Sequence, residues 1–206
     1  MNTGKLYLDY KIIFMLFLAI AIPAVSVFGQ IKEQLPYREI VDYPEKYTAG
    51  TVASRMVDGL GFRYFWTTED LKINNLTYKP ESGARTIQET LNHIYQLTQV
   101  LCKMVKVDSK DLNIEENEIS FAELRRSTLL NIQLASTKLL SSNAKDLEGY
   151  NLKTSSGSDI PFWNLLNGPI EDAVWHCGQV VYLRRLAGNP ISSDVSFFAG
   201  KIRSTQ

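Results

Sequence analysis

Three side chains that can bind metal ions occur on two segments with helical character. Asp172 and His176 are four residues apart, which places them one turn apart on the same face of a helix. His93, the other of the chain's two histidines, lies in a second helical segment. Two imidazoles and a carboxylate form a known three-ligand set that leaves a coordination position open for water or substrate. The sequence therefore predicts a divalent-metal site formed by His93, Asp172 and His176.

A purely structural role is the competing interpretation of these residues. A single His or Asp on an inward helix face is more often a satisfied core residue or a solvated edge than a ligand. Both histidines, however, are followed by apolar residues at positions +4, +7 and +11, so each stands at the edge of a dry core. Polar groups there are costly without partners, which favours ligation. Zinc is the expected ion, with nickel, manganese and iron(II) as alternatives because a carboxylate is a harder ligand than imidazole.

Two helices are expected in the first half of the chain. Apolar residues recur at four-residue intervals over about residues 51–65, and this helix is expected to end near Thr67 and Thr68. The next helix begins with Thr86 and Glu89, the spacing of a capping box in which each side chain binds a free backbone N–H. It should extend to about Val105, which places His93 in its second or third turn.

Two further helices are expected in the second half. A second capping box, Ser120 with Glu123, begins a helix that should end near Ser142. The last helix is expected to have Pro169 at its first position and Gly188 at its end. Residues 143–160 are rich in Ser, Asn and Gly and predict a loop, and no strand pattern is visible. The sequence therefore predicts an all-α four-helix bundle.

The N-terminus is typical of a secretory signal. Lys5 and Lys11 precede an apolar run over residues 12–28, and small side chains near Gly29 fit a cleavage site. An uncleaved membrane anchor is the alternative, although the run is short for a spanning helix. The expected organisation is a signal peptide (1–29), an extended arm (30–50), the bundle (51–190) and a tail (191–206). Cleavage would deliver the chain to the periplasm or the extracellular space.

Composition excludes several classes of protein. The chain has 206 residues, with 22 basic and 22 acidic side chains, so no net positive field exists to attract nucleic acid. Its two cysteines, Cys102 and Cys177, cannot form the framework of a small disulfide-rich domain. Each lies in an apolar helical pattern, which favours two free, buried thiols over a disulfide between them.

Two segments resemble signatures of the DinB-like (DinB/YfiT) superfamily. The segment 86–94, TIQETLNHI, is similar to the family's second-helix signature. The segment 170–180, IEDAVWHCGQV, followed by LRR at 183–185 and GNP at 188–190, is similar to its last-helix signature. The resemblance implies a four-helix bundle with an up-down-down-up course, often assembled as a homodimer. It also implies a divalent metal held between three histidines.

The resemblance assigns the family's first ligand to His93 and its third to His176. At the second position, four residues before the third, this chain has Asp172 where the family has histidine. The change is compatible with a retained metal and with a branch that has lost it. Resemblance then implies a metal-dependent hydrolase or a thiol-dependent transferase acting on a small molecule that the sequence does not identify. The alternative is a non-catalytic exported bundle with a ligand-binding or structural role.

Several other residues could bind a ligand or take part in catalysis, but the sequence favours a structural role for them. The two neighbours Arg184 and Arg185 could bind an anion, but cations in a last helical turn more often complement the helix dipole and cover neighbouring carbonyls. Cys177 points about 100° away from His176 around the helix, which makes Cys-His nucleophilic chemistry improbable. Four further residues could form a pocket wall, although core packing is the usual role of aromatic residues at helical spacing: Tyr95, Trp163, Asn164 and Trp175.

Overall fold

Four long helices form the main body of the computed structural model, which describes residues 34–112 and 119–203. The expected all-α class is confirmed. The predicted signal peptide, residues 1–29, lies outside the described residues. The four helices are α2 (Ala49–Thr68), α3 (Ile87–Met104), α4 (Phe121–Leu140) and α7 (Glu171–Leu186).

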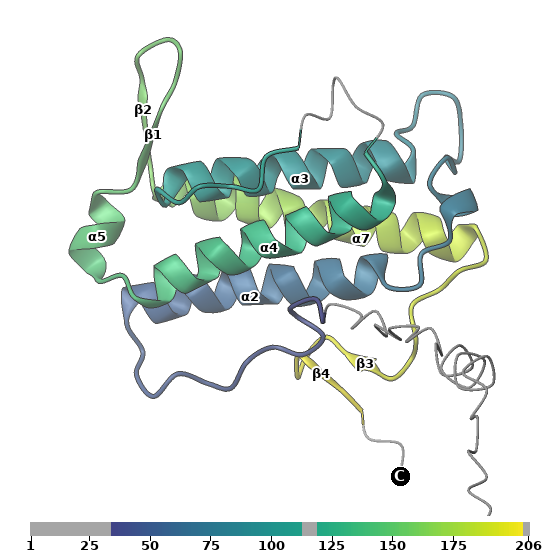
Figure 1. The fold of residues 1–206 in the computed structure, drawn as a ribbon, viewed down its shortest axis with the longest axis horizontal. Coiled ribbons are helices and arrows are strands. Elements are labelled where there is room, and N and C mark those ends of the chain that lie inside the picture. Colours follow the sequence, from purple (N-terminus) through teal and green to yellow (C-terminus); the bar gives the residue numbers. More distant parts are fainter. Residues whose placement is uncertain (1–33, 113–118, 204–206) are drawn as a thin grey trace, which may run out of the picture. The chain divides into compact units, whose positions relative to one another are not determined.

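The core lies between these four helices. α2 packs against α4 and α7, and α3 packs against the same two helices. In Figure 1, α2 and α7 run in one direction along the molecule, while α3 and α4 run in the opposite direction. Each helix contributes fully buried apolar side chains, such as Phe62, Leu91, Leu129 and Val180, and removing these from water is the main stabilising contribution.

The capping residues define where α3 and α4 begin. The Glu89 N–H donates to Thr86 Oγ1 at 3.1 Å, and the Thr86 N–H donates to Glu89 Oε2 at 2.7 Å. The predicted capping box of α3 is therefore confirmed. At α4, the Glu123 N–H donates to Ser120 Oγ at 3.2 Å, which is the serine half of the predicted box.

α2 begins slightly before the expected start, at Ala49, and ends at Thr68, where the sequence predicted its end. Thr48 caps it, because its hydroxyl accepts from the Thr51 N–H while the Thr51 hydroxyl accepts from the Thr48 N–H. At the other end, the Thr68 hydroxyl donates to the Tyr64 carbonyl at 2.7 Å. Threonine side chains at both ends form hydrogen bonds with backbone groups at the helix ends. The spacing of apolar residues does not indicate such bonds.

Residues 143–160 do not form the loop that was predicted. They contain the short helix α5 (Ala144–Glu148) and an antiparallel hairpin of β1 (Asn151–Lys153) and β2 (Asp159–Pro161), in which Leu152 faces Ile160. The expectation of no strands was therefore wrong. Strands of three residues are too short to show an alternating pattern in the sequence.

The approach to α7 also differs from the prediction. α6 (Trp163–Leu165) is followed by a π-helical turn, η2 (Leu166–Ile170), which contains Pro169. α7 therefore begins at Glu171, and Pro169 is not its first residue. Gly168 has non-helical backbone angles, φ −91° and ψ −109°, which produce a kink there. The predicted end of α7 is confirmed, because Gly188 adopts φ +75° directly after the helix.

The described part of the N-terminal arm packs against the C-terminal tail. The tail forms a second hairpin, β3 (Val195–Ser196) with β4 (Lys201–Ile202), which was not expected. The Ile40 N–H donates to the Gly200 carbonyl at 2.9 Å, and the Ile40 side chain is buried. A single 3₁₀ turn, η1 (Ile73–Asn75), lies in the connection between α2 and α3. Within the described ranges, no helix combines the length and apolar character needed to cross a membrane.

Candidate metal centre

The packing of α3 against α7 brings the three predicted ligands together. His93 lies at the end of the second turn of α3. Asp172 is the second residue of α7, and His176 follows one turn later. The two helices run in opposite directions (Figure 1), and their contact brings the three side chains to the same height in the bundle. The prediction that these three side chains converge is confirmed by their positions.

Asp172 lies between the two imidazoles. Its Oδ2 is 3.4 Å from Nε2 of His93, and its Oδ1 is 3.3 Å from Nε2 of His176. The two imidazole rings stand nearly perpendicular, at 85°, with their centroids 4.7 Å apart. One potential ligand atom from each residue lies within 4.8 Å of the others, so the group could hold a metal ion.

The separations between the donor atoms match the requirements of a tetrahedral ion. Zinc binds nitrogen and oxygen ligands at about 2.0–2.2 Å. Two such ligands at the tetrahedral angle are therefore about 3.4 Å apart. The two nitrogen–oxygen distances, 3.3 and 3.4 Å, have this length. The two distances involve different oxygens of Asp172, so a single ion would take one of them, and one potential ligand atom from each of the three residues lies within 4.8 Å of the others.

Gln179 sets the orientation of the His176 ring. Its Oε1 lies 2.7 Å from Nδ1 of His176. When this oxygen accepts, Nδ1 carries the hydrogen and the lone pair of a neutral imidazole is on Nε2, facing Oδ1 of Asp172. Two electron-rich atoms at 3.3 Å repel unless a cation lies between them. A metal ion at this position would remove the repulsion.

The sequence did not single out Gln179. The available signal was its position three residues after His176, which places both side chains on one face of α7. The second ring nitrogen of a metal-binding histidine commonly forms a hydrogen bond, and a glutamine at this spacing is able to be its partner.

The site is open to solvent on one side. The side chains of His93 and Asp172 are 30% and 44% exposed, whereas that of His176 is 12% exposed. Water or a small molecule can therefore reach the donor atoms. The neighbouring carboxylate, Glu171, is exposed and is not part of the converging group, as expected from its position 100° around the helix.

The aromatic candidates divide into two groups. Tyr95 is buried, and its hydroxyl donates to the Lys110 carbonyl at 2.6 Å. Trp163 and Trp175 are 75% and 71% exposed, so core packing was the wrong interpretation for both. The short α6 and the kink before α7 remove Trp163 from a regular helix, whereas Trp175 lies on α7 itself, on a face that the core does not cover. Asn164 is also exposed.

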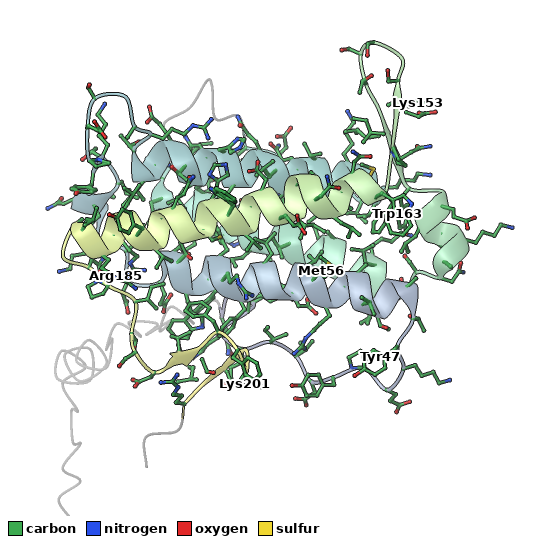
Figure 2. All side chains as sticks on the ribbon, turned by 180° about the vertical axis from the view of Figure 1, so that it is seen from behind. Tyr47, Met56, Lys153, Trp163, Arg185 and Lys201 are labelled. Carbon is green, nitrogen blue, oxygen red and sulfur yellow. The ribbon has the colours of Figure 1, made fainter. Side chains whose placement is uncertain are left out.

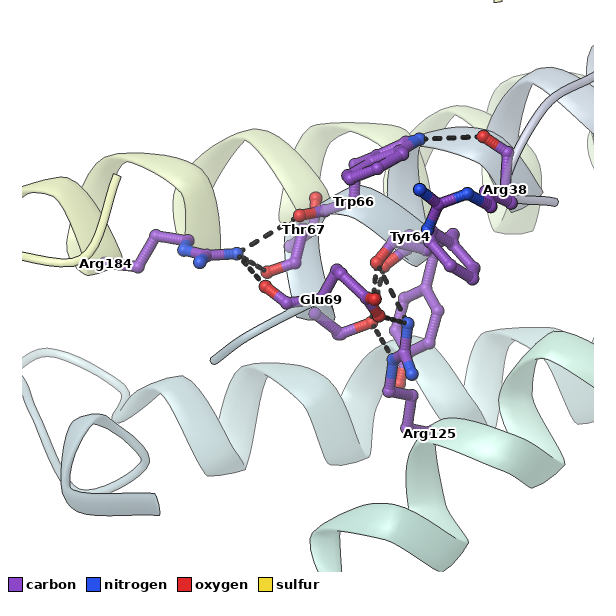
Figure 3. Close-up of polar contacts among 9 residues, drawn as sticks. Arg38, Tyr64, Trp66, Thr67, Glu69, Arg125 and Arg184 are labelled. Carbon is purple, nitrogen blue, oxygen red and sulfur yellow. Dashed lines mark hydrogen bonds and ion pairs between the residues drawn. The ribbon is translucent and has the colours of Figure 1, made fainter. Parts of the chain in front are cut away.

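Arg184 is a structural residue rather than an anion site. It is only 1% exposed, and its guanidinium donates to the carbonyls of Trp66, Thr67 and Glu69 at the end of α2 (Figure 3). Arg184 covers carbonyls, as the preferred interpretation expected, but they are those at the end of α2 rather than those of its own last turn. Which carbonyls Arg184 contacts is decided by the packing of α7 against α2, and the local sequence around Arg184 does not indicate it. Arg185 is exposed.

Both cysteines are free and buried, as predicted. Burial raises the pKa of Cys102 and of Cys177 to about 12. The thiols are therefore protonated near neutral pH and are poor nucleophiles. This agrees with the expectation that Cys177 takes no part in chemistry at His176.

Comparisons with known proteins do not identify a relative. No family model, no curated protein sequence and no solved structure matches this chain.

Proposed function

We propose that this protein binds one divalent metal ion, zinc in the first place, through His93, Asp172 and His176. The observation that carries the proposal is the convergence of three ligand-type side chains from two helices, with donor separations of 3.3 and 3.4 Å. Nickel, manganese and iron(II) are the alternatives that a mixed imidazole and carboxylate set admits.

We further propose a Lewis-acid enzyme acting on a small molecule. A divalent ion with an open position lowers the pKa of a bound water or thiol, which supports hydrolysis or a thiol-dependent transfer. Gln179 would hold the His176 ring with Nε2 directed at the ion. The exposed side of Asp172 and His93 leaves room for the substrate.

Membership of the DinB-like superfamily remains part of this proposal. Two features of the fold support it. α2 and α7 run in one direction while α3 and α4 run in the other (Figure 1), and the second and last long helices, α3 and α7, meet at the site. The resemblance of segments 86–94 and 170–180 supplies the sequence argument. The substitution of Asp172 for histidine would then be a variation within the same ligand geometry.

A non-catalytic bundle is the second candidate, and one observation favours it. Each oxygen of Asp172 faces its own imidazole, and this is also the geometry of a carboxylate between two protonated or hydrogen-bonded histidines. In that case the three residues join α3 to α7 without an ion, and the protein has a structural or ligand-binding role.

Cobalt substitution can separate the two candidates. Co²⁺ reports its coordination through its visible absorption, and a tetrahedral site absorbs far more strongly than hexa-aquo cobalt. We expect chelator-treated protein to gain this absorption with one equivalent of Co²⁺, and mercaptoethanol or acetohydroxamate to shift it by occupying the open position. An unchanged spectrum on adding both compounds would indicate a closed site and favour the non-catalytic candidate.

Export and dimer formation are proposed on the sequence and the resemblance. N-terminal sequencing of the protein from its native host should begin near Gln30. A membrane-bound chain that still begins at Met1 would contradict cleavage. Light scattering should give twice the chain mass for a homodimer, and the single-chain mass would contradict it.

A further inference from the structure

A large apolar cleft lies apart from the metal centre. It has a volume of about 680 Å³ and lies between the first turns of α2, the helix α5 and the segment that contains α6. Val52, Met56, Leu147 and Phe162 are among the side chains that line it. None of the three proposed metal ligands belongs to the lining. The cleft is therefore a separate feature that the proposed function does not use.

Several large apolar side chains in the lining of the cleft are unusually exposed to solvent. Trp163 is 75% exposed, Val52 49% and Met56 37%. Figure 2 shows Met56 on α2 and Trp163 beside the start of α7; Trp163 belongs to α6, which borders the cleft together with α2 and α5. Isolated exposed apolar residues are common, but a group of them around one hollow is characteristic of a binding site.

The size of the cleft favours a small molecule over a protein partner. Small-molecule sites usually have volumes of about 300–1,000 Å³ and are concave and mostly apolar. A stable protein interface needs about 800 Å² on each partner and is usually flatter. The volume of 680 Å³ lies within the first range.

The charge of the lining indicates which molecule fits. Glu148 is exposed and is the only charged residue among those that line the cleft. The Thr48 hydroxyl is already engaged in capping α2, which leaves the Tyr47 hydroxyl as the other polar group. A ligand with an apolar body therefore fits best if its polar end is a cation.

We propose that this cleft binds a small amphiphilic cation, with its apolar body against Val52, Met56 and Trp163 and its ammonium end at Glu148. This goes beyond the metal site, since the two sites share no residue. The proposal therefore holds whether or not the metal is confirmed.

Calorimetry with three matched probes tests the proposal on the full-length protein. Decyltrimethylammonium, decanol and decyl sulfate share one alkyl chain and differ in charge, and each is used below its micellar concentration. We expect saturable binding in the order cation, neutral, anion. The emission of Trp163 should shift to shorter wavelength on binding, because the ligand displaces water from its exposed ring.

Three variants locate the binding. Met56→Gln keeps the length and helix propensity of the side chain but places an amide without a partner in the cleft, so we expect about tenfold weaker binding of the cation. Glu148→Gln should remove the preference for the cation over decanol. Ile73→Gln, a change at a 70% exposed apolar residue outside the cleft, is the matched control and should leave binding unchanged.

Two results would overturn the proposal. One is binding of decyl sulfate as tight as that of the cation, since Glu148 should disfavour an anion. The other is equal binding of the cation by Met56→Gln and the unsubstituted protein. His176→Ala separates this outcome from the metal hypothesis, because it should lose metal and retain the probe.

Discussion

Replacing Arg184 with methionine should strongly destabilise the protein. Arg184 lies near the end of α7, and its Nη1 donates to three carbonyls at the end of α2, with distances of 3.1, 2.8 and 3.0 Å to Trp66, Thr67 and Glu69. The last turn of α2 has no basic residue of its own. Arg184 therefore supplies the donors that these terminal carbonyls need.

The expected loss follows from the groups left without partners. Each buried acceptor that loses its hydrogen bond costs about 1–3 kcal/mol. Burial also lowers the pKa of Arg184, which indicates that the charge itself is desolvated at some cost. Methionine removes that cost and fills much of the volume. The balance is a destabilisation of about 3 kcal/mol, within the range for breaking a buried charged contact.

Urea unfolding measures this loss, and the neighbouring arginine provides the control. Arg185→Met removes the same side chain from an exposed position in the same turn, so the change should stay within about 0.5 kcal/mol. An equal, small effect of the two substitutions would refute the assignment of Arg184 as the cap of α2.

Three further predictions concern residues away from the metal centre. Gly50→Ala should destabilise by about 3 kcal/mol in urea unfolding, because its Cβ would lie 2.0 Å from the Ser142 carbonyl oxygen, whereas Gly178→Ala, with open space, should stabilise by about 1 kcal/mol. Burial raises the pKa of Asp58, so its contribution to stability falls as the pH rises through the folded-state value; the stability of Asp58→Asn relative to the unsubstituted protein should therefore increase from about pH 4 to pH 7. Ellman's reagent at pH 8 should leave Cys102 and Cys177 unmodified in the folded protein and react with both in urea; rapid reaction of the folded protein would contradict their burial.

The sequence predicted those features of the fold that depend on local chemistry. The capping box of Thr86 with Glu89 and the glycine after α7 are local signals, and both were located correctly. The turn before α7 was misjudged because Pro169 suits both the first position of a helix and the π-helical turn that it occupies. Packing against other helices decides between such alternatives, and single-sequence patterns do not contain it.

The candidate site could be predicted because its three ligands are chemically distinctive. His93 and His176 are the chain's only histidines, and Asp172 is one turn from the second. The role of Gln179 was missed because glutamine at i+3 is ordinary on a helix surface, and only the distance to Nδ1 of His176 makes it relevant. The apolar cleft was missed because its lining comes from three separated segments, and nothing in their local patterns indicates that they meet.

The most direct test of the metal hypothesis is elemental analysis of protein purified without a metal-affinity tag. We expect about one divalent ion per chain, lost in His176→Ala and much reduced in Asp172→Ala, because removing a ligand removes a large part of the affinity. Glu171→Ala removes an adjacent exposed carboxylate and should retain the metal. Equally negligible metal in the unsubstituted protein and in His176→Ala, including after incubation with zinc, would contradict the proposed metal centre.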